Sequence, residues 1–115
     1  MPPFVKSSPA LVARFDEAAA RHPHAERRQM LGYPALFVGG NLATGLFAES
    51  WMVRLSPDDL TALLALEGAG PFTPMPGRTM AGYGTLPPDI ASDDAALDLW
   101  LGRALSFAAS LPAKR

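Results

Sequence analysis

The fold of this 115-residue chain is decided by residues 33–48, which read YPALFVGGNLATGLFA. Two apolar runs flank Gly39-Gly40-Asn41, and these residue types tolerate the positive φ that a tight turn between strands requires. The pattern therefore predicts a β-hairpin. In residues 51–55 (WMVRL), every second side chain is large and apolar, so we expect a third strand whose Trp51, Val53 and Leu55 face the core.

Three helices are predicted around this hairpin. Ser8-Pro9 and Ser56-Pro57 each join an N-cap hydroxyl to a proline at the first helical position, where the missing N–H costs nothing. We expect Ser92 to cap the last helix in the same way. That helix has apolar positions at steps of four and three, namely Leu97, Leu101, Ala104, Ala108 and Leu111.

The order of elements predicts the fold class. Residues 78–86 read as a weaker strand interrupted by glycines, so the order is helix, three strands, helix, one or two strands, helix. Hairpin connections favour antiparallel pairing. We predict a two-layer α+β fold, an antiparallel sheet with helices packed mainly on one face, in a single domain over residues 1–115. The other face would be exposed or covered by a second copy.

Composition narrows the classes of function. Ten basic and eleven acidic residues give a net charge of −1, which favours neither nucleic acid nor an anionic membrane as a partner. The absence of cysteine excludes disulfides and thiolate chemistry. Residues 29–48 carry no charge, but their glycines and proline suit a buried hairpin better than a spanning helix. The first residues lack the pattern of a secretory signal, so we expect a cytoplasmic protein.

Few residues suggest catalysis or metal binding. His22, His24 and Glu26 lie two residues apart, and an extended backbone would point all three to one face. A solvated connector explains them better, because Pro23 ends the preceding helix. The pairs Asp58-Asp59 and Asp93-Asp94 stand at predicted helix starts, where free N–H groups and the helix dipole favour acids. We predict no catalytic residue, no metal and no cofactor.

The residues expected to contact a partner are Arg27, Arg28, Met75 and Arg78. Arg27 and Arg28 precede alternating apolar residues, and a solvated strand end explains them better than a nucleic-acid site. In residues 74–78 (PMPGR), two prolines fix φ and a glycine frees the next turn, which presents Met75 and Arg78 at a defined place.

Several segments together resemble the TfoX N-terminal domain family. They are residues 28–33 (RQMLGY), the hairpin from Phe37 to Phe47, the loop from Pro71 to Met80, Leu86-Pro87, and the closing pattern of Trp100, Ala104, Phe107 and Ala108. The resemblance spans about residues 9–112, with Leu31 in place of the usual phenylalanine. It implies a small α+β domain without known catalytic residues. The namesakes of the family are regulators of natural competence that work with other transcription factors and carry a second domain, for which this chain has no room.

From these observations we expect a non-enzymatic regulatory or protein-interaction domain with an unknown protein partner, able to pair with a second copy of itself. One alternative is a small-molecule-binding protein or minor enzyme that uses a cleft between the Met75–Arg78 loop and the sheet. A further alternative is a nucleic-acid accessory protein, whose affinity would fall steeply with salt.

Overall fold

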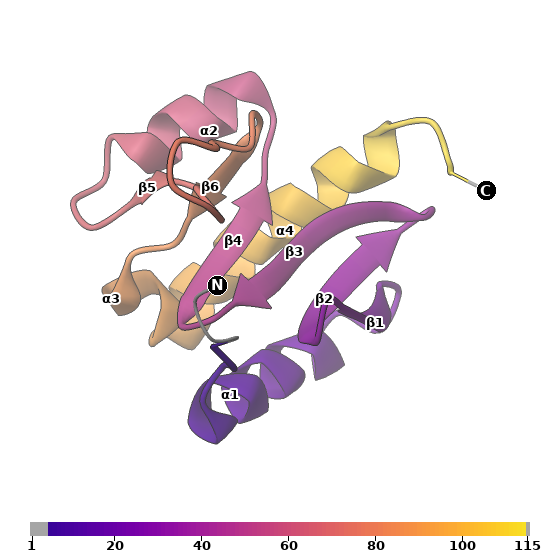
Figure 1. Cartoon of the computed structure of the whole chain (residues 1–115). Helices are drawn as coiled ribbons and strands as arrows, with labels where there is room; N and C mark the ends of the chain where they lie inside the picture. The colour runs from indigo at the N-terminus through magenta and orange to yellow at the C-terminus, as the bar shows by residue number, and fades with distance from the viewer. Residues whose placement is uncertain (1–4, 115) are drawn as a thin grey trace.

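The chain folds into one open sheet with helices around it (Figure 1). The computed structural model describes residues 5–114. Its helices are α1 (Pro9–Ala20), α2 (Pro57–Leu64), α3 (Pro88–Ala91) and α4 (Asp94–Ser110). Its strands are β1 (Glu26–Met30), β2 (Tyr33–Val38), β3 (Asn41–Phe47), β4 (Ser50–Arg54), β5 (Gly70–Pro71) and β6 (Tyr83–Thr85). Within these described residues, no helix is long and apolar enough to cross a bilayer.

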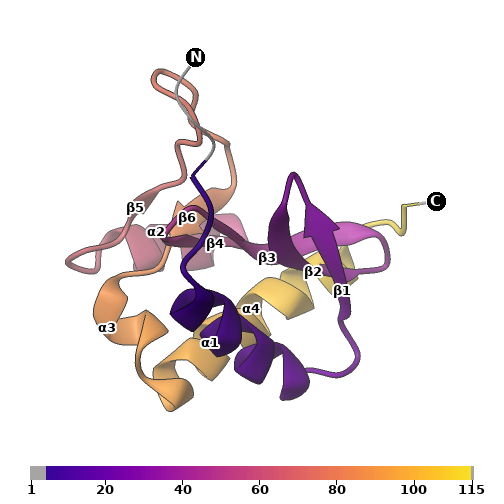
Figure 2. The same ribbon diagram turned by 60° about the horizontal axis from the view of Figure 1, so that its bottom comes forward.

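The sheet is antiparallel throughout, and its strands follow the order β1-β2-β3-β4-β6-β5. Figure 2 shows α1, α3 and α4 beneath this sheet, with α4 running across β2, β3 and β4. Helix α2 packs on the same side against β5 and β6, where Leu60 and Leu63 lie over Gly84. The predicted α+β fold with helices mainly on one face is confirmed.

The core fills the space between the sheet and the helices. Its largest buried side chains come from every layer, including Phe15 of α1, Trp51 of β4, Leu63 of α2 and Leu101 of α4. Val53 and Leu55 are buried as well, so the predicted inward face of the third strand is confirmed. The rings of Phe15 and Trp51 lie 5.2 Å apart, which ties the first helix to the centre of the sheet.

One polar side chain in this core makes two hydrogen bonds. Thr44 is fully buried; its hydroxyl accepts a hydrogen bond from Trp51 Nε1 at 2.9 Å and donates one to the carbonyl of Met52 at 2.7 Å. A buried indole N–H left without an acceptor would cost about 1–3 kcal/mol. Thr44 therefore allows a tryptophan to fill the core without that penalty.

The helix starts agree with the sequence at two of three places. Ser8 accepts from the backbone N–H of Leu11, and Ser56 accepts from that of Asp59. The prediction for Ser92 was wrong, because Asp93 is the N-cap of α4 and accepts from the N–H of Ala96. Ser92 instead ends the short helix α3, which the sequence pattern did not predict.

The strands differ from the prediction at both ends of the sheet. Strand β1 is an additional edge strand, paired in register with β2 from Glu26↔Phe37 to Met30↔Tyr33. Its side chains are largely exposed, so it carries no alternating apolar signal. The weak strand expected over residues 78–86 shrinks to β6, because residues 72–80 fold back on themselves as a loop and the N–H of Met80 donates to the carbonyl of Phe72.

Two aromatic residues of the hairpin lie outside the main core. Phe37 and Phe47 are half-buried, and neither belongs to the cluster between sheet and helices. Strand pairing places Phe47 on the face shared by Ala35, Gly45 and Met52, which is the face away from the helices. Within residues 5–114, no helix covers that second face (Figure 2).

Candidate interaction groove

An apolar groove occupies the helix-free face of the sheet. Its cavity volume is about 390 Å³. We call it the methionine groove; its lining residues are Met30, Leu31, Tyr33, Leu42, Leu46, Phe47, Met52, Phe72, Pro74, Met75 and Met80. No carboxylate, imidazole or amine occurs among these lining residues, and the hydroxyl of Tyr33 donates a hydrogen bond to the carbonyl of Val5.

The floor of the groove is a row of aromatic rings beside a buried methionine. The ring of Phe47 lies 5.2 Å from that of Tyr33 and 5.6 Å from that of Phe72. Gly45 leaves room for Met52, since a Cβ at Gly45 would stand 3.1 Å from the methyl carbon of Met52. These contacts hold the floor in place without help from a helix.

Methionine is concentrated at this face. Four of the five methionines of the chain line the groove, and they come from β1, β4 and the 72–80 loop. The unbranched thioether side chain has three rotatable bonds and is polarisable, so it adapts its shape to whatever packs against it. A groove lined in this way suits the binding of apolar side chains.

The first wall of the groove is the turn between β1 and β2. Leu31 and Gly32 both have positive φ, 54° and 85°, as a two-residue hairpin turn requires. Asparagine and glycine are the residues that accept this conformation readily, whereas leucine pays a steric cost of roughly 1–2 kcal/mol. Leu31 is nevertheless 79% exposed. A strained and exposed leucine does not stabilise the fold, which indicates that its side chain serves a contact with a binding partner.

The second wall is the 72–80 loop. The N–H of Arg78 donates to the carbonyl of Met75 at 2.9 Å, with Pro76 and Gly77 between them and Gly77 at φ 75°. This is the geometry of a tight turn with proline at the second position and glycine at the third. The turn holds Met75, which is 56% exposed, at the rim of the groove.

The three arginines singled out in the sequence have different surroundings. Arg28 forms two hydrogen bonds to Glu26, and its guanidinium lies 5.0 Å from the ring of Phe37. The hydrogen bond from Arg28 lowers the pKa of Glu26. Arg27 is paired with Asp16 at 2.7 Å. Arg78 stands exposed beside the groove and has no ion pair among the described residues.

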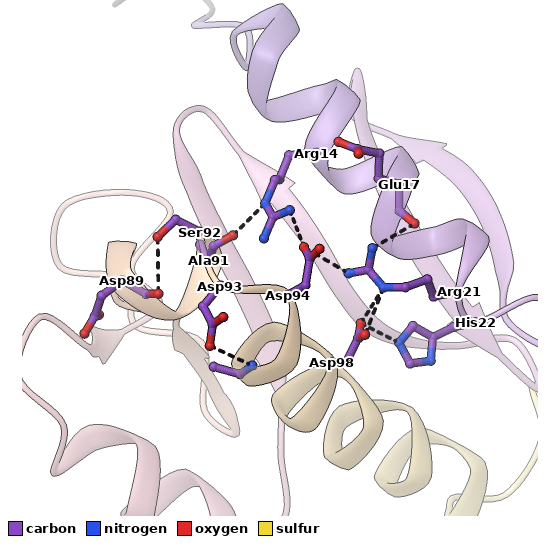
Figure 3. Close-up of polar contacts among 11 residues, drawn as sticks. Arg14, Glu17, Arg21, His22, Asp89, Ala91, Ser92, Asp93, Asp94 and Asp98 are labelled. Carbon is purple, nitrogen blue, oxygen red and sulfur yellow. Dashed lines mark hydrogen bonds and ion pairs between the residues drawn. The ribbon is translucent and has the colours of Figure 1, made fainter.

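The acidic residues near the start of α4 hold two helices together (Figure 3). Arg14 of α1 and Arg21, the residue that caps its C-terminal end, reach Asp94, and Arg21 also pairs with Asp98 at 2.9 Å. His22 Nε2 lies 3.3 Å from the same carboxylate of Asp98. Partial burial raises the pKa of Asp98, but the hydrogen bonds and charges of Arg21 and His22 outweigh it, so the net pKa is lowered.

The ion pairs between α1 and α4 give the polar residues of this region a structural role. The ring of His24 lies 6.2 Å from that of His22, and no group of three or more His, Asp or Glu within residues 5–114 is arranged to hold a metal ion. A wider depression of about 550 Å³ lies between α2 and α4, but there Arg103 is close to Asp59 at 3.9 Å and stacks on Trp100. The methionine groove is therefore the better candidate for a functional site.

Most residues of the methionine groove were not predicted from the sequence. Met75 was singled out from its rigid loop, whereas Met30, Leu31, Met52 and Met80 were not. One signal could have found them: residues 29–48 carry no charge and residues 68–88 carry only Arg78, although both segments contribute surface. Uncharged segments that remain partly exposed are typical of a contact surface.

Comparison with known families gives a match over most of the chain. The model of the TfoX N-terminal domain matches residues 10–108. We find no significant match among curated proteins or among solved structures.

Proposed function

Because the chain belongs to the TfoX N-terminal domain family, we propose that it is a non-enzymatic protein-interaction domain with a regulatory role in the cytoplasm, and that the methionine groove is where it docks its partner. The observation that carries the proposal is an apolar, methionine-lined groove on the face of the sheet without helices. Exposed apolar patches of this kind mark interaction sites in otherwise ordinary monomers.

The chemistry of the groove supports binding rather than catalysis. General acid–base catalysis requires a titratable group within reach of the substrate, and nucleophilic catalysis requires an activated nucleophile. The lining residues offer thioethers, aliphatic groups and rings, with one tyrosine hydroxyl already bonded to Val5. Such a surface gains free energy by excluding water from a partner's apolar side chains.

Proteins captured from a native lysate by three versions of the chain provide the test. The versions are wild type, Met75→Asp, and the matched control Leu99→Asp on α4, since Met75 and Leu99 are 56% and 54% exposed. We expect a partner that wild type and the control retain and that Met75→Asp loses. The same proteins bound by all three versions would refute docking at the groove.

A second candidate function follows from the size of the cavity. About 390 Å³ falls within the range of pockets that bury a small molecule. An apolar compound could therefore fill the groove in place of a protein. Native mass spectrometry of the purified chain distinguishes the two, because a bound compound adds a discrete mass. Met75→Asp and Met80→Asp should lower the fraction of the protein that carries this added mass.

A further inference from the structure

We propose that the occupant of the methionine groove is an α-helix of another protein, with apolar residues on one side and acidic residues along its flank. This inference rests on the proposed docking function and adds the chemistry of the partner. Three features of the groove carry it: the backbone of the sheet beneath it, the shape of its two walls and the charge at its rim.

The sheet face selects a helix over an extended peptide. The central strands β2, β3 and β4 have hydrogen-bonded neighbours on both sides, so the face above them presents side chains and no free backbone edge. An extended peptide buried there would leave its own N–H and C=O groups without partners, which costs about 1–3 kcal/mol for each group. A helix satisfies its backbone internally and brings a stripe of apolar side chains.

The walls suit the apolar stripe of that helix. Leu31 projects from one wall, and Met75 and Met80 stand on the other, above a floor that includes Phe47. Residues three and four apart on a helix lie on one face, so one helix can place side chains between the walls at each turn. The strained turn that holds Leu31 outward makes functional sense when that leucine packs against the helix.

The charge at the rim selects an acidic partner. Arg78 is the one charged side chain in segments 29–48 and 68–88, and it has no ion pair within the described structure, whereas Arg28 and Glu26 of β1 are paired with each other. A carboxylate on the incoming helix would give Arg78 a partner, whereas a lysine or arginine there would be repelled.

A second copy of the chain fits less well. It would offer the same concave face and the same positive charge, because an interface with two-fold symmetry joins identical patches. The partner that complements the groove is convex and acidic.

Selection from a random peptide display library tests this inference while the natural partner is still unidentified. Peptides of about 18 residues are suitable, since such a helix is roughly 27 Å long and the shortest extent of the chain is 28 Å. The intact chain is the bait, Met75→Asp is the counter-bait, and Leu99→Asp is the matched control on which the selected peptides are measured. We expect peptides that lose at least about tenfold in affinity with Met75→Asp and keep it with Leu99→Asp. They should carry apolar residues at helical spacing and an excess of Asp and Glu.

A charge exchange then tests the role of Arg78. Arg78→Glu should weaken the acidic peptides by about three- to tenfold, and the same peptides with Lys in place of Glu should recover that loss on Arg78→Glu. Arg103→Glu, on the opposite side of the sheet, makes the same change in net charge and should leave affinity unchanged.

The outcomes separate this inference from the proposed function. Peptides that depend on Met75 but show no helical spacing, no acidic excess or no response to Arg78→Glu would overturn the inference and leave docking at the groove intact. A selection in which no peptide depends on Met75 overturns both. Sedimentation that shows a wild-type dimer and a Met75→Asp monomer would make a second copy the occupant and overturn the acidic helix.

Discussion

The two faces of the sheet differ in how fully their side chains are buried. The face toward the helices buries Leu36, Val53 and their neighbours at close to zero exposure, and the buried hydroxyl of Thr44 there makes two hydrogen bonds. The other face keeps a groove open between Leu31 and Met75, both largely exposed. One face therefore has nothing left to gain from a partner, whereas the other has apolar area still in contact with water.

This difference teaches where stability and binding reside in a domain of this size. Strand alternation sends every second side chain to each face, so the same β3 and β4 serve both. Substitutions toward the helices should change the free energy of unfolding. Substitutions of the exposed groove residues Leu31 and Met75 should change affinity and leave the fold intact.

The largest effect is expected on the helix-covered face. Leu101→Ala in α4 removes a fully buried side chain between the sheet and α4, and it should lower the free energy of unfolding by about 2–5 kcal/mol because a cavity remains. Urea denaturation followed by circular dichroism measures it. A loss below about 1 kcal/mol would mean that this face is packed more loosely than the structure shows.

How much of this contrast could be predicted from the sequence depends on burial. The stripe of α4 is buried on one side only, so its periodicity was visible, and in β4 Trp51 and Val53 alternate with Met52, which is buried in the other face. Strand β1 carries exposed polar residues and owes its place to pairing with β2, which leaves no apolar pattern. Ser92 and Asp93 were both suitable caps, and the turn of α3 decides between them.

The groove was harder to predict than the fold. Its lining comes from β1, the β1–β2 turn, β2, β3, β4 and the 72–80 loop, and strand pairing alone brings these segments together. The rigidity of residues 74–78 was readable from two prolines and a glycine. The strain at Leu31 was not, because φ is a property of the folded turn.

A smaller loss of stability is expected at Gly84, where helix α2 lies close to the backbone of the sheet. A Cβ at Gly84 would stand 2.9 Å from Leu63 Cδ2 and 3.1 Å from Leu60 Cδ1, so Gly84→Ala should push α2 outward and cost about 1–3 kcal/mol. Gly102→Ala is the control, since nothing lies within 4 Å of that position in α4 and alanine there should gain up to about 1 kcal/mol. Thermal unfolding of both variants checks the pair. Equal effects would contradict the close packing of α2.

A still smaller effect belongs to the ion pairs between α1 and α4. Hydrogen bonds and charges from Arg21 and His22 outweigh the opposing effect of burial and lower the pKa of Asp98. A carboxyl with a lowered folded pKa stabilises the protein above its unfolded pKa of about 3.9, and this contribution fades as the pH falls through the folded value.

Asp98→Asn should therefore reduce stability at pH 7 by less than about 1 kcal/mol, because Asp98 is one-third exposed and water screens the pair. The gap between wild type and variant should close as the pH falls below about 4. Denaturation at a series of pH values measures the gap. A difference that persists unchanged in acid would show that packing, not charge, links the two helices at this point.

The smallest change in stability is a gain, and it falls on the open face. Leu31→Asn places asparagine before Gly32, the pair that a turn with two positive φ values favours, so the variant should be more stable by roughly 0.5 kcal/mol. The same substitution removes an exposed apolar side chain from the wall of the methionine groove and should weaken partner binding. Thermal unfolding and peptide affinity, measured on one preparation, test both halves together. If the variant gained stability and lost no affinity, Leu31 would have no role in binding. A gain in stability together with a loss in affinity is what a residue kept for binding requires.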